Sequence, residues 1–309
     1  HVFTMLDHVV RDKEKFNDLF LQWSVLECFN SWLEFGVSHT NLTFLESSEL
    51  INFCFKSLEV QKHFEDAVQA IISLIKISKD ITAHPQLAKI VIQKVMDLTG
   101  HCNAAFEKEE YEDLNDYARI FGKLGEVHAS LIADQASGDV LNLLDVILNL
   151  STLEQVNVDM WYRFWHTFCF QTARIKDKQS REAKSQVFGP YVLKLVPSLI
   201  KHSQLDETDM TDCNERGLEN CKHLDETLIL RDDIEKLLID MVLIAGTEDM
   251  FNKILTCFKE ELADIPLPNC SVEESCIIEA YIHGITALSR LAAEKCTNEF
   301  FAIVKEMME

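Results

Sequence analysis

Apolar residues recur at three- and four-residue spacing along almost the whole chain, which is the period of amphipathic helices. The segment 111–133 shows this pattern most fully. Its apolar stripe consists of Leu114, Tyr117, Ala118, Phe121, Leu124, Gly125, His128, Leu131 and Ile132. Charged residues such as Glu112, Arg119 and Lys123 lie on the opposite face. The pattern predicts one helix over 111–133 with a wide apolar face.

Amphipathic segments of this kind follow one another in pairs. The predicted pairs occupy about residues 1–38, 43–80, 84–134, 138–176, 182–246 and 248–297, with a partial pair at 298–309. Their spacing fits HEAT or armadillo repeats, with a period of about 40–47 residues, better than the ~34-residue tetratricopeptide unit. One pair cannot bury its own apolar stripe, but stacked neighbours can. The sequence therefore predicts an all-α fold, a single α-solenoid of HEAT-type hairpins.

Two prolines and one insert refine this organisation. Pro85 stands where a helix begins, a position at which its missing N–H costs little. Pro197 falls inside the segment Phe188–His202 and is expected to bend that helix. The acidic stretch at about 203–226 has few large apolar residues and is expected to be an exposed, mobile insert. The first residues already follow the helical pattern without a starting Met, so we expect the chain to be a piece of something longer.

The stretch MWYRFWHTF, Met160–Phe168, is unusually rich in aromatic rings. Rings in this number could stack nucleic-acid bases, surround a cationic ligand or fill a core. Four of them share one helix face, at positions i, i+3, i+4 and i+7: Trp161, Phe164, Trp165 and Phe168. A base-stacking surface would need interleaved cations, and Arg163 is the basic residue nearby. We therefore interpret these residues as core-structural, with an aromatic ligand patch as the alternative.

The overall charge restricts the possible partners. The 309 residues include 29 Lys and Arg against 51 Asp and Glu, giving a net charge of −22. Such a surface repels phosphate backbones, so direct nucleic-acid binding is not expected, and basic protein partners are favoured. Only 9 glycines and 5 prolines are present, which favours helices over sheets rich in turns. No apolar run is long enough to span a bilayer, so no membrane partner is expected.

The cysteines and histidines suggest no reactive or metal site. The ten cysteines form no C-x-x-C pair and are expected to be reduced thiols. Those at 54, 169 and 276 sit among apolar neighbours and are expected to be buried and inert. Cys213, Cys221 and His223 lack the spacing and the fourth ligand of a zinc site, so a solvated loop is the preferred interpretation. His128 is interpreted as a core residue with a satisfied side chain.

No catalytic constellation is recognisable, since no Ser–His or Cys–His pair occurs in a nucleophile context and no phosphate-binding glycine motif is present. We therefore predict a protein that is not an enzyme and needs no cofactor or metal. An enzyme built on helices remains an alternative, which would require a pocket with converging titratable groups.

Five phrases carry a family resemblance. CFNSWLEFG, YARIFGKLGEVHASLI, RFWHTF, LRDDIEKLLIDMVLIAG and EAYIHGITALS occur in this order, from about Phe16 to Leu291. Together they resemble the middle section of the importin-β (karyopherin) superfamily of nuclear transport receptors, and most of all its transportin-SR branch. Each phrase alone is loose, because HEAT helices are degenerate, but five in order with matching spacing are fairly specific.

The resemblance implies a superhelical HEAT array that carries cargo through the nuclear pore and is found in the nucleus and the cytoplasm. Members of the family bind protein cargo on a concave inner surface and bind the GTPase Ran in its GTP form. They dock phenylalanine-glycine nucleoporins between outer helices. The resemblance also implies basic or serine/arginine-rich cargo. The strongest Ran contacts of the family lie in earlier repeats, and its Arg-rich cargo helix has no match here. The alternative is a HEAT scaffold of another complex that does not bind Ran.

Acidic residues gather where second helices of two predicted pairs begin. Because second helices face the concave side in this family, these residues are the candidate partner-binding set. They are Glu109, Glu110, Glu112, Asp113 and Asp116 in one cluster, and Asp232, Asp233 and Glu235 in the other. Carboxylates at a helix N-terminus are also favoured by the helix dipole, by about 0.3–1 kcal/mol each, so they need no partner to explain them. The excess negative charge keeps a basic partner as the functional interpretation.

Overall fold

The structure is a computed structural model that describes residues 2–12, 16–35, 42–135, 138–208, 225–266, 270–289 and 291. Within these ranges the chain forms helices joined by turns, without a β-strand. None of the helices in the described ranges combines the length and the apolarity needed to cross a membrane. Most of the acidic insert predicted at 203–226 lies outside the described residues, as do Cys213, Cys221, His223 and the partial pair at 298–309.

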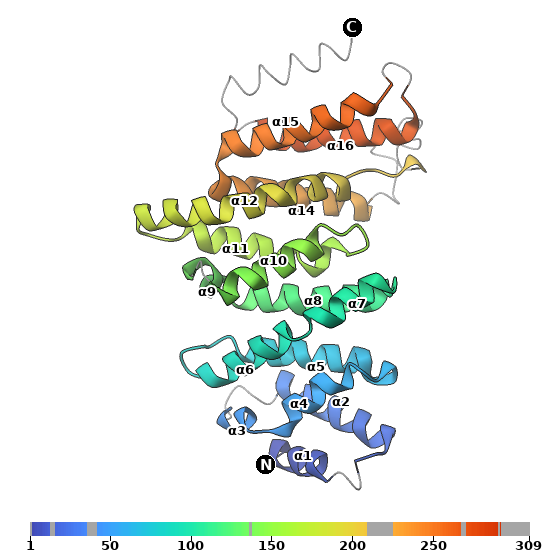
Figure 1. The fold of residues 1–309 in the computed structure, drawn as a ribbon, viewed down its shortest axis with the longest axis vertical. Helices are drawn as coiled ribbons and strands as arrows, with labels where there is room; N and C mark the ends of the chain where they lie inside the picture. The colour runs from blue at the N-terminus through green and yellow to red at the C-terminus, as the bar shows by residue number, and fades with distance from the viewer. Residues whose placement is uncertain are drawn as a thin grey trace. The chain divides into compact units, whose positions relative to one another are not determined.

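The chain divides into two compact units. The first unit comprises His1–Ala129, Gly138–Leu150 and Gln155–Phe164. Its helices are α1 (Val2–Arg11), α2 (Leu19–Phe35), α3 (Thr43–Glu46), α4 (Glu49–Ser57), α5 (Phe64–Ile77), α6 (Pro85–Met96), α7 (Thr99–Glu107), α8 (Tyr111–Val127) and most of α10 (Asp139–Ser151), with 3-10 turns η2 (Gln61–His63) and η3 (Val158–Met160). In Figure 1 these helices follow one another in chain order. As predicted, Pro85 is the first residue of a helix.

Helices α2, α5 and α8 lie parallel to one another in the first unit. The Nε2 atom of His63 lies 3.2 Å from the carbonyl oxygen of Leu19, and Ser73 donates a hydrogen bond to the side chain of Asn30. The contacts between α2 and α5 therefore advance in the same direction along both helices. The rings of Phe64 and Tyr117 are 5.6 Å apart, which places the starts of α5 and α8 together in the same way. The three helices begin 45 and 47 residues apart, within the HEAT period and longer than the ~34-residue tetratricopeptide unit.

The segment 111–133 is not the single helix that the pattern predicts. Helix α8 ends at Val127, the backbone of His128 leaves helical geometry (φ −105°, ψ 17°), and α9 (Ala129–Asp134) follows. The break coincides with the burial of the His128 ring, whose Nε2 atom lies 3.3 Å from the Ser78 hydroxyl. Burial lowers the pKa of His128 to about 4, so the imidazole is neutral. Its other nitrogen has no hydrogen-bond partner, so the side chain is only half satisfied.

The second unit comprises Ser130–Ser137, Ser151–Glu154 and Trp165–Glu309. Its long helices are α12 (Lys178–His202), α14 (Asp225–Ala245), α15 (Thr247–Asp264) and α16 (Val272–Ser289). The division between the units falls inside α11 (Tyr162–Ala173). Helix α12 packs against α14 and α15, and α15 packs against α16. Helix α12 contains Pro190 as well as Pro197 and continues through both.

The predicted aromatic stripe is buried, with Trp161 directly before α11 and the other three rings within it. Trp161 is 1% exposed, and Phe164, Trp165 and Phe168 are fully buried. In the second unit the indole N–H of Trp165 donates to the Ser151 hydroxyl at 2.9 Å. These rings have no solvent-facing surface that a nucleic-acid base or a ligand could stack on.

Three cysteines singled out by the pattern, Cys54, Cys169 and Cys276, are also buried. Burial raises the pKa of each of their thiols above the ordinary value. Since the thiolate is the nucleophilic form, these thiols are unreactive at neutral pH.

Candidate partner-binding surface

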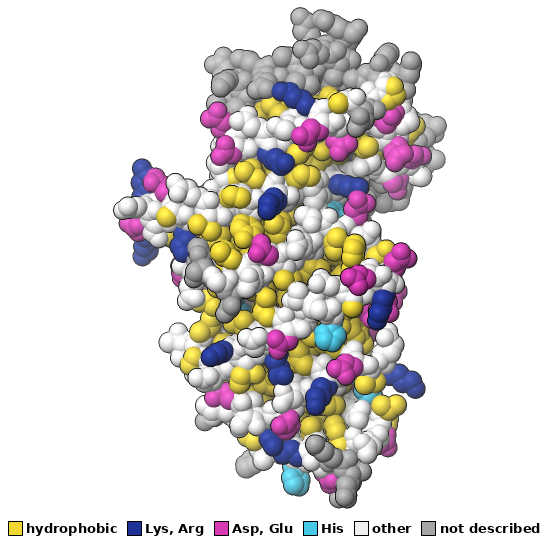
Figure 2. Space-filling model, in the orientation of Figure 1, with side chains coloured by type: hydrophobic (Ala, Val, Ile, Leu, Met, Phe, Trp, Pro, Cys, Tyr) yellow, Lys and Arg dark blue, Asp and Glu magenta, His cyan; other side chains and the backbone are white. Residues whose placement is uncertain are grey.

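The first predicted acidic cluster forms an exposed ridge in the first unit. We call Glu109, Glu110, Glu112, Asp113 and Asp116 the acidic ridge. They belong to the turn after α7 and the first turns of α8. The three glutamates are exposed, and the two aspartates are half-buried. Figure 2 shows Asp and Glu side chains at the edge where α7 passes into α8.

Burial first, and repulsion between neighbouring carboxylates second, raise the pKa values of the two half-buried aspartates of the ridge. Burial raises the pKa of Asp113, and the charges of Glu110 and Glu112 raise it further, against a hydrogen bond from Gln61. Burial also raises the pKa of Asp116, and burial together with nearby carboxylates outweighs the opposing effect of Arg119. A raised carboxyl pKa means that the folded chain disfavours the charged form. The ridge therefore carries negative charge that its own surroundings do not fully compensate.

The parallel arrangement of α5 and α8 extends the acidic field beyond the ridge. Glu65 on α5 contributes to the raised pKa of Asp116. Glu59, in the turn before η2, acts on the buried Tyr117, whose pKa is raised to about 12, mainly by burial. Arg119 lies 3.2 Å from a carboxylate oxygen of Asp116 and is itself about one-third exposed, so this ion pair is weak. A cationic segment of a partner would find several carboxylates on neighbouring helices.

Glu109 occupies a backbone conformation that favours glycine. Its φ is +60°, in the left-handed region. The Glu109 N–H donates to the Phe106 carbonyl, and the Glu110 N–H donates to the Ala105 carbonyl. These two bonds form a Schellman motif that ends α7, in which Glu109 holds the position usually taken by glycine. A charged residue is kept there despite backbone strain.

Replacing Glu109 by glycine is expected to stabilise the first unit. Glycine removes the left-handed penalty, and after its own entropic cost the net gain is about 0.5–1 kcal/mol in the free energy of unfolding. Urea denaturation of the wild-type chain and of Glu109→Gly measures the change. Glu109→Asn is the matched control, because asparagine removes the same charge and tolerates this conformation. A loss of stability in both variants would contradict the strained geometry.

The second predicted cluster differs from the ridge because a cation contacts two of its carboxylates. On α14, Lys236 lies 2.6 Å from an Asp232 carboxylate oxygen and 3.2 Å from one of Asp233. Glu235 is half-buried near His283, whose pKa is lowered by burial and by the neighbouring Arg231. Asp232 and Asp233 therefore share one cation, Lys236, within the second unit. The structure separates the two clusters into one with uncompensated charge and one with local partners.

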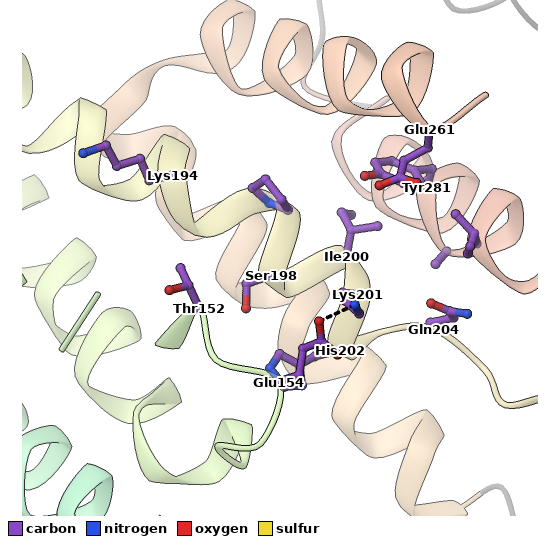
Figure 3. Close-up of a pocket in the computed structure, with 13 residues that line it drawn as sticks. Thr152, Glu154, Lys194, Ser198, Ile200, Lys201, His202, Gln204, Glu261 and Tyr281 are labelled. Atoms are coloured by element: carbon purple, nitrogen blue, oxygen red, sulfur yellow. Dashed lines mark hydrogen bonds and ion pairs between the residues drawn. The ribbon is translucent and has the colours of Figure 1, made fainter. Parts of the chain in front are cut away.

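A groove in the second unit was not anticipated from the sequence. It has a volume of about 300 Å³ and is lined by α12, α15, α16 and the loop after α10. Its lining residues are Thr152, Glu154, Lys194, Pro197, Ser198, Ile200, Lys201, His202, Gln204, Glu261, Ile277, Ala280 and Tyr281. Figure 3 shows Ile200 and Tyr281 directed toward this space, with the ion pair of Lys201 and Glu154 at one end. We call this feature the α12 groove.

The chemistry of the α12 groove is that of an apolar slot with a charged rim. Tyr281 is almost fully buried and stacks on Phe258, with ring centroids 5.4 Å apart. Burial is the main reason that the pKa of Tyr281 is raised, so the phenol remains neutral. The one signal that sequence reasoning had for this groove was Pro197. The apolar residues that α16 contributes fall within an ordinary helical stripe and give no separate signal.

Across the described residues, no three His, Cys, Asp or Glu side chains are arranged so that they could hold a metal ion. The ridge can attract cations, and the groove can enclose one apolar side chain of modest size.

Comparison with known proteins finds similarity to the transportin and importin type. Residues 109–202 match the family described as the Transportin-3/Importin-13 second TPR domain. The chain is 23% identical to Importin-13 of Gallus gallus over 270 residues, which is 82% of this chain and 27% of that protein. It is 24% identical over 198 residues to the uncharacterized protein C11G11.07 of Schizosaccharomyces pombe, which is 63% of this chain and 20% of that protein. The chain thus spans about a quarter of these relatives.

Proposed function

We propose that this chain, which is of the importin-β and transportin type, serves in a nuclear transport receptor that binds protein cargo and Ran in its GTP form. The observation that carries the proposal is the alignment with Importin-13 over 82% of the chain. The receptor would shuttle between the nucleus and the cytoplasm and act by binding alone, without catalysing a reaction. Its affinity would come from many shallow contacts spread along successive helical hairpins.

The acidic ridge supports a basic cargo, such as a serine/arginine-rich segment. Five carboxylates lie on the ridge itself, and Glu65 on the parallel helix α5 adds to the same field. The raised pKa values of Asp113 and Asp116 mean that a cation placed there would relieve repulsion as well as form new ion pairs. Electrostatic attraction of this kind raises the association rate and selects basic partners.

The α12 groove supports contact with phenylalanine-glycine nucleoporins. Its apolar lining of Pro197, Ile200 and Ile277 suits a single phenyl ring. Helices α12 and α15, which both line it, are the first helices of two successive predicted pairs. Outer helices of this kind are where the family resemblance leads us to expect such contacts.

Charge reversal on the ridge tests the cargo assignment. In Glu110→Lys/Glu112→Lys, we expect the affinity for an arginine-serine repeat peptide to fall by about tenfold or more, because two attractive charges become repulsive. The matched control is Asp232→Lys/Asp233→Lys, which changes the net charge equally at a site where both carboxylates already pair with Lys236. Fluorescence anisotropy at fixed salt measures both. Equal losses in the two variants would point to the general field of the chain and would remove the ridge as the cargo site.

Ran binding distinguishes a transport receptor from another HEAT scaffold. A receptor segment within the full-length protein would capture Ran loaded with GTP and not Ran loaded with GDP. A scaffold of another complex would capture neither form. Pull-down of the full-length protein with both nucleotide states separates the two functions, and absence of capture in either state would end the transport assignment.

A further inference from the structure

A basic patch stands out on the second unit of this acidic chain. The eleven residues 174–184, RIKDKQSREAK, contain five of the 29 Lys and Arg residues and only two acids. The cations are Arg174, Lys176, Lys178, Arg181 and Lys184. They lie in the turn between α11 and α12 and in the first turns of α12. The local charge is therefore positive, whereas the chain as a whole carries −22.

The helix that carries these cations projects from its unit. The buried residues of α12 begin at Phe188, so its first ten residues, 178–187, bury no side chain. Figure 1 shows this start of α12 running beyond α11 and α14, and Figure 2 shows dark-blue side chains gathered there. We call residues 174–187 the basic arm. A stretch of helix without a fully buried side chain gains little stability from packing.

Local contacts hold the arm in place and leave its positive charge available. Asp177 caps the start of α12, where its carboxylate accepts the N–H of Ser180 at 2.6 Å. The amine of Lys184 donates to the carbonyl of Asp134 at 2.7 Å, so this cation meets a backbone oxygen and not a carboxylate. Lys178 lies 3.7 Å from Glu182, with both side chains mostly exposed, which is a weak pair. Asp177 is thus used as a helix cap, and Glu182 forms only a weak ion pair.

Arginine side chains of the arm are arranged to meet planar anions. The guanidinium of Arg174 lies over the ring of Phe170, 5.1 Å from its centroid, and Phe170 is about half exposed. Stacking on a ring holds the guanidinium plane while its N–H edges remain able to donate. Arg181 is half-buried one turn after Lys178, so the two cations share one face of the helix. Guanidinium groups bind carboxylates through paired hydrogen bonds.

We propose that the basic arm is a docking surface for a short carboxylate-rich segment of a partner protein. The ten-residue start of α12 is about 15 Å long, which an extended acidic peptide of about five residues would cover. A nucleic acid fits less well, because its phosphates would continue past the arm onto a strongly negative chain within about one Debye length of 8–10 Å. The inference concerns a site apart from the acidic ridge and the α12 groove, and it does not depend on Ran or on cargo.

A pair of labelled peptides tests the arm. One contains a run of glutamates between Gly and Ser residues, and the other has glutamine at each of those positions. We expect the wild-type chain to bind the glutamate peptide and not the glutamine peptide by fluorescence anisotropy. In Lys178→Glu/Arg181→Glu, we expect the affinity for the glutamate peptide to fall about tenfold or more, as for other rim charges facing an opposite charge. Lys178→Gln/Arg181→Gln should show a smaller loss in the same direction while keeping good helix formers in α12.

The matched control is Lys79→Glu/Lys89→Glu, which changes the net charge equally at exposed positions of the first unit. This control is expected to retain wild-type affinity within about twofold, since it leaves every cation of the arm in place. Far-UV circular dichroism verifies that each variant is folded. Equal losses in the control and in the arm variants would overturn the proposal. So would equal binding of the two peptides, or tighter binding of a single-stranded oligonucleotide or of phosphatidylserine vesicles than of the glutamate peptide.

Discussion

Gly122→Ala is expected to lower the free energy of unfolding by about 3 kcal/mol or more, because the new methyl group would collide with backbone. A Cβ built on Gly122 lies 2.0 Å from the carbonyl oxygen of Met160 and 3.0 Å from its carbonyl carbon. Both residues belong to the first unit, where η3 lies directly against α8. A backbone carbonyl cannot swing aside as the end of a side chain can. The substitution would therefore separate η3 from α8, or distort both.

Gly100→Ala provides the matched comparison for this substitution. Gly100 lies in α7, and a Cβ added there meets no atom within 4 Å. Alanine is the better helix former, so we expect a gain of up to about 1 kcal/mol. Urea denaturation followed by circular dichroism measures both variants. If Gly122→Ala unfolds at the wild-type midpoint, α8 and η3 do not approach as closely as described.

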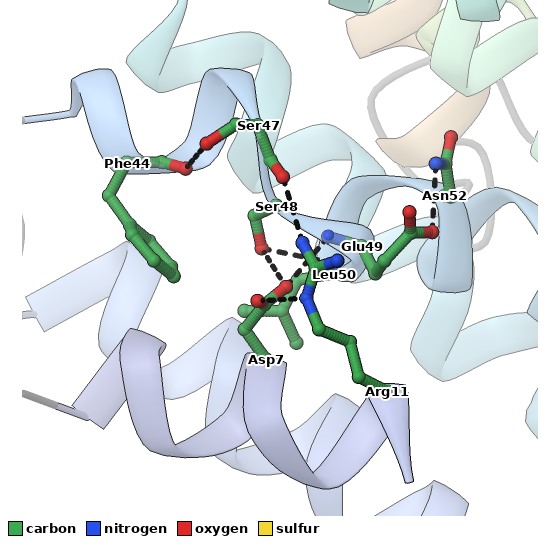
Figure 4. A network of polar contacts seen from close by, with 8 residues as sticks. All are labelled: Asp7, Arg11, Phe44, Ser47, Ser48, Glu49, Leu50 and Asn52. Carbon is green, nitrogen blue, oxygen red and sulfur yellow. Dashed lines mark hydrogen bonds and ion pairs between the residues drawn. The ribbon is translucent and has the colours of Figure 1, made fainter. Parts of the chain in front are cut away.

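Asp7→Ala is expected to lower the free energy of unfolding of the first unit by about 2–3 kcal/mol, because one carboxylate serves several hydrogen bonds. Figure 4 shows Asp7 of α1 facing the start of α4. One of its oxygens accepts the Ser48 hydroxyl at 2.8 Å and the Glu49 N–H at 2.7 Å, and the other accepts Arg11 Nε at 2.7 Å. Arg11 also donates to the carbonyl of Ser47 at 3.0 Å. Removing the carboxylate would leave donors at the N-terminus of α4 without an acceptor.

The free energy of unfolding is expected to depend on pH through Asp7 and through the buried His128 in two different pH ranges. Burial by itself would raise the pKa of Asp7, but the hydrogen bonds from Arg11, Ser48 and the Glu49 N–H outweigh it and hold the pKa below its ordinary value. The stability that Asp7 contributes is thus present above about pH 4 and is lost as the pH falls through its folded pKa. The pKa of His128 is about 4 in the folded chain and about 6.5 in the unfolded chain. Its protonation therefore lowers the free energy of unfolding as the pH drops from about 6.5 to about 4, before Asp7 titrates.

Asp7→Asn is the control for both the contact and the titration. Asparagine keeps the shape and one acceptor oxygen, so its loss of stability should be smaller than that of alanine. It cannot titrate, so the free energy of unfolding should depend less on pH below about 4 and remain unchanged in slope between about 4 and 6.5. A wild-type slope below pH 4 in Asp7→Asn would mean that other carboxylates control the acid limb.

Periodicity was enough to predict the helices, because their stability comes from the same apolar stripes that make the pattern visible. It could not place the break at His128, since the stripe continues across it, and the buried hydrogen bond to Ser78 joins residues 50 positions apart. The sequence also could not predict the Asp7 network, because a lone aspartate beside the apolar positions of a helix forms no pattern of its own. The ion pairs of Lys236 could have been predicted from the sequence. Lys236 stands three residues after Asp233 and four after Asp232, which is the spacing of helical ion pairs.

The two prolines of α12 give that helix a preferred direction of bending. Pro190 and Pro197 are seven residues apart, close to two helical turns, so both lie on the same side of the helix. Each deprives the carbonyl four residues earlier of its usual N–H donor, and the softened bonds are therefore aligned along one edge. Thermal flexing of α12 is then anisotropic, easy in a single plane and stiff across it. Since Pro197 lines the α12 groove, bending of α12 in that plane would change the width of the groove.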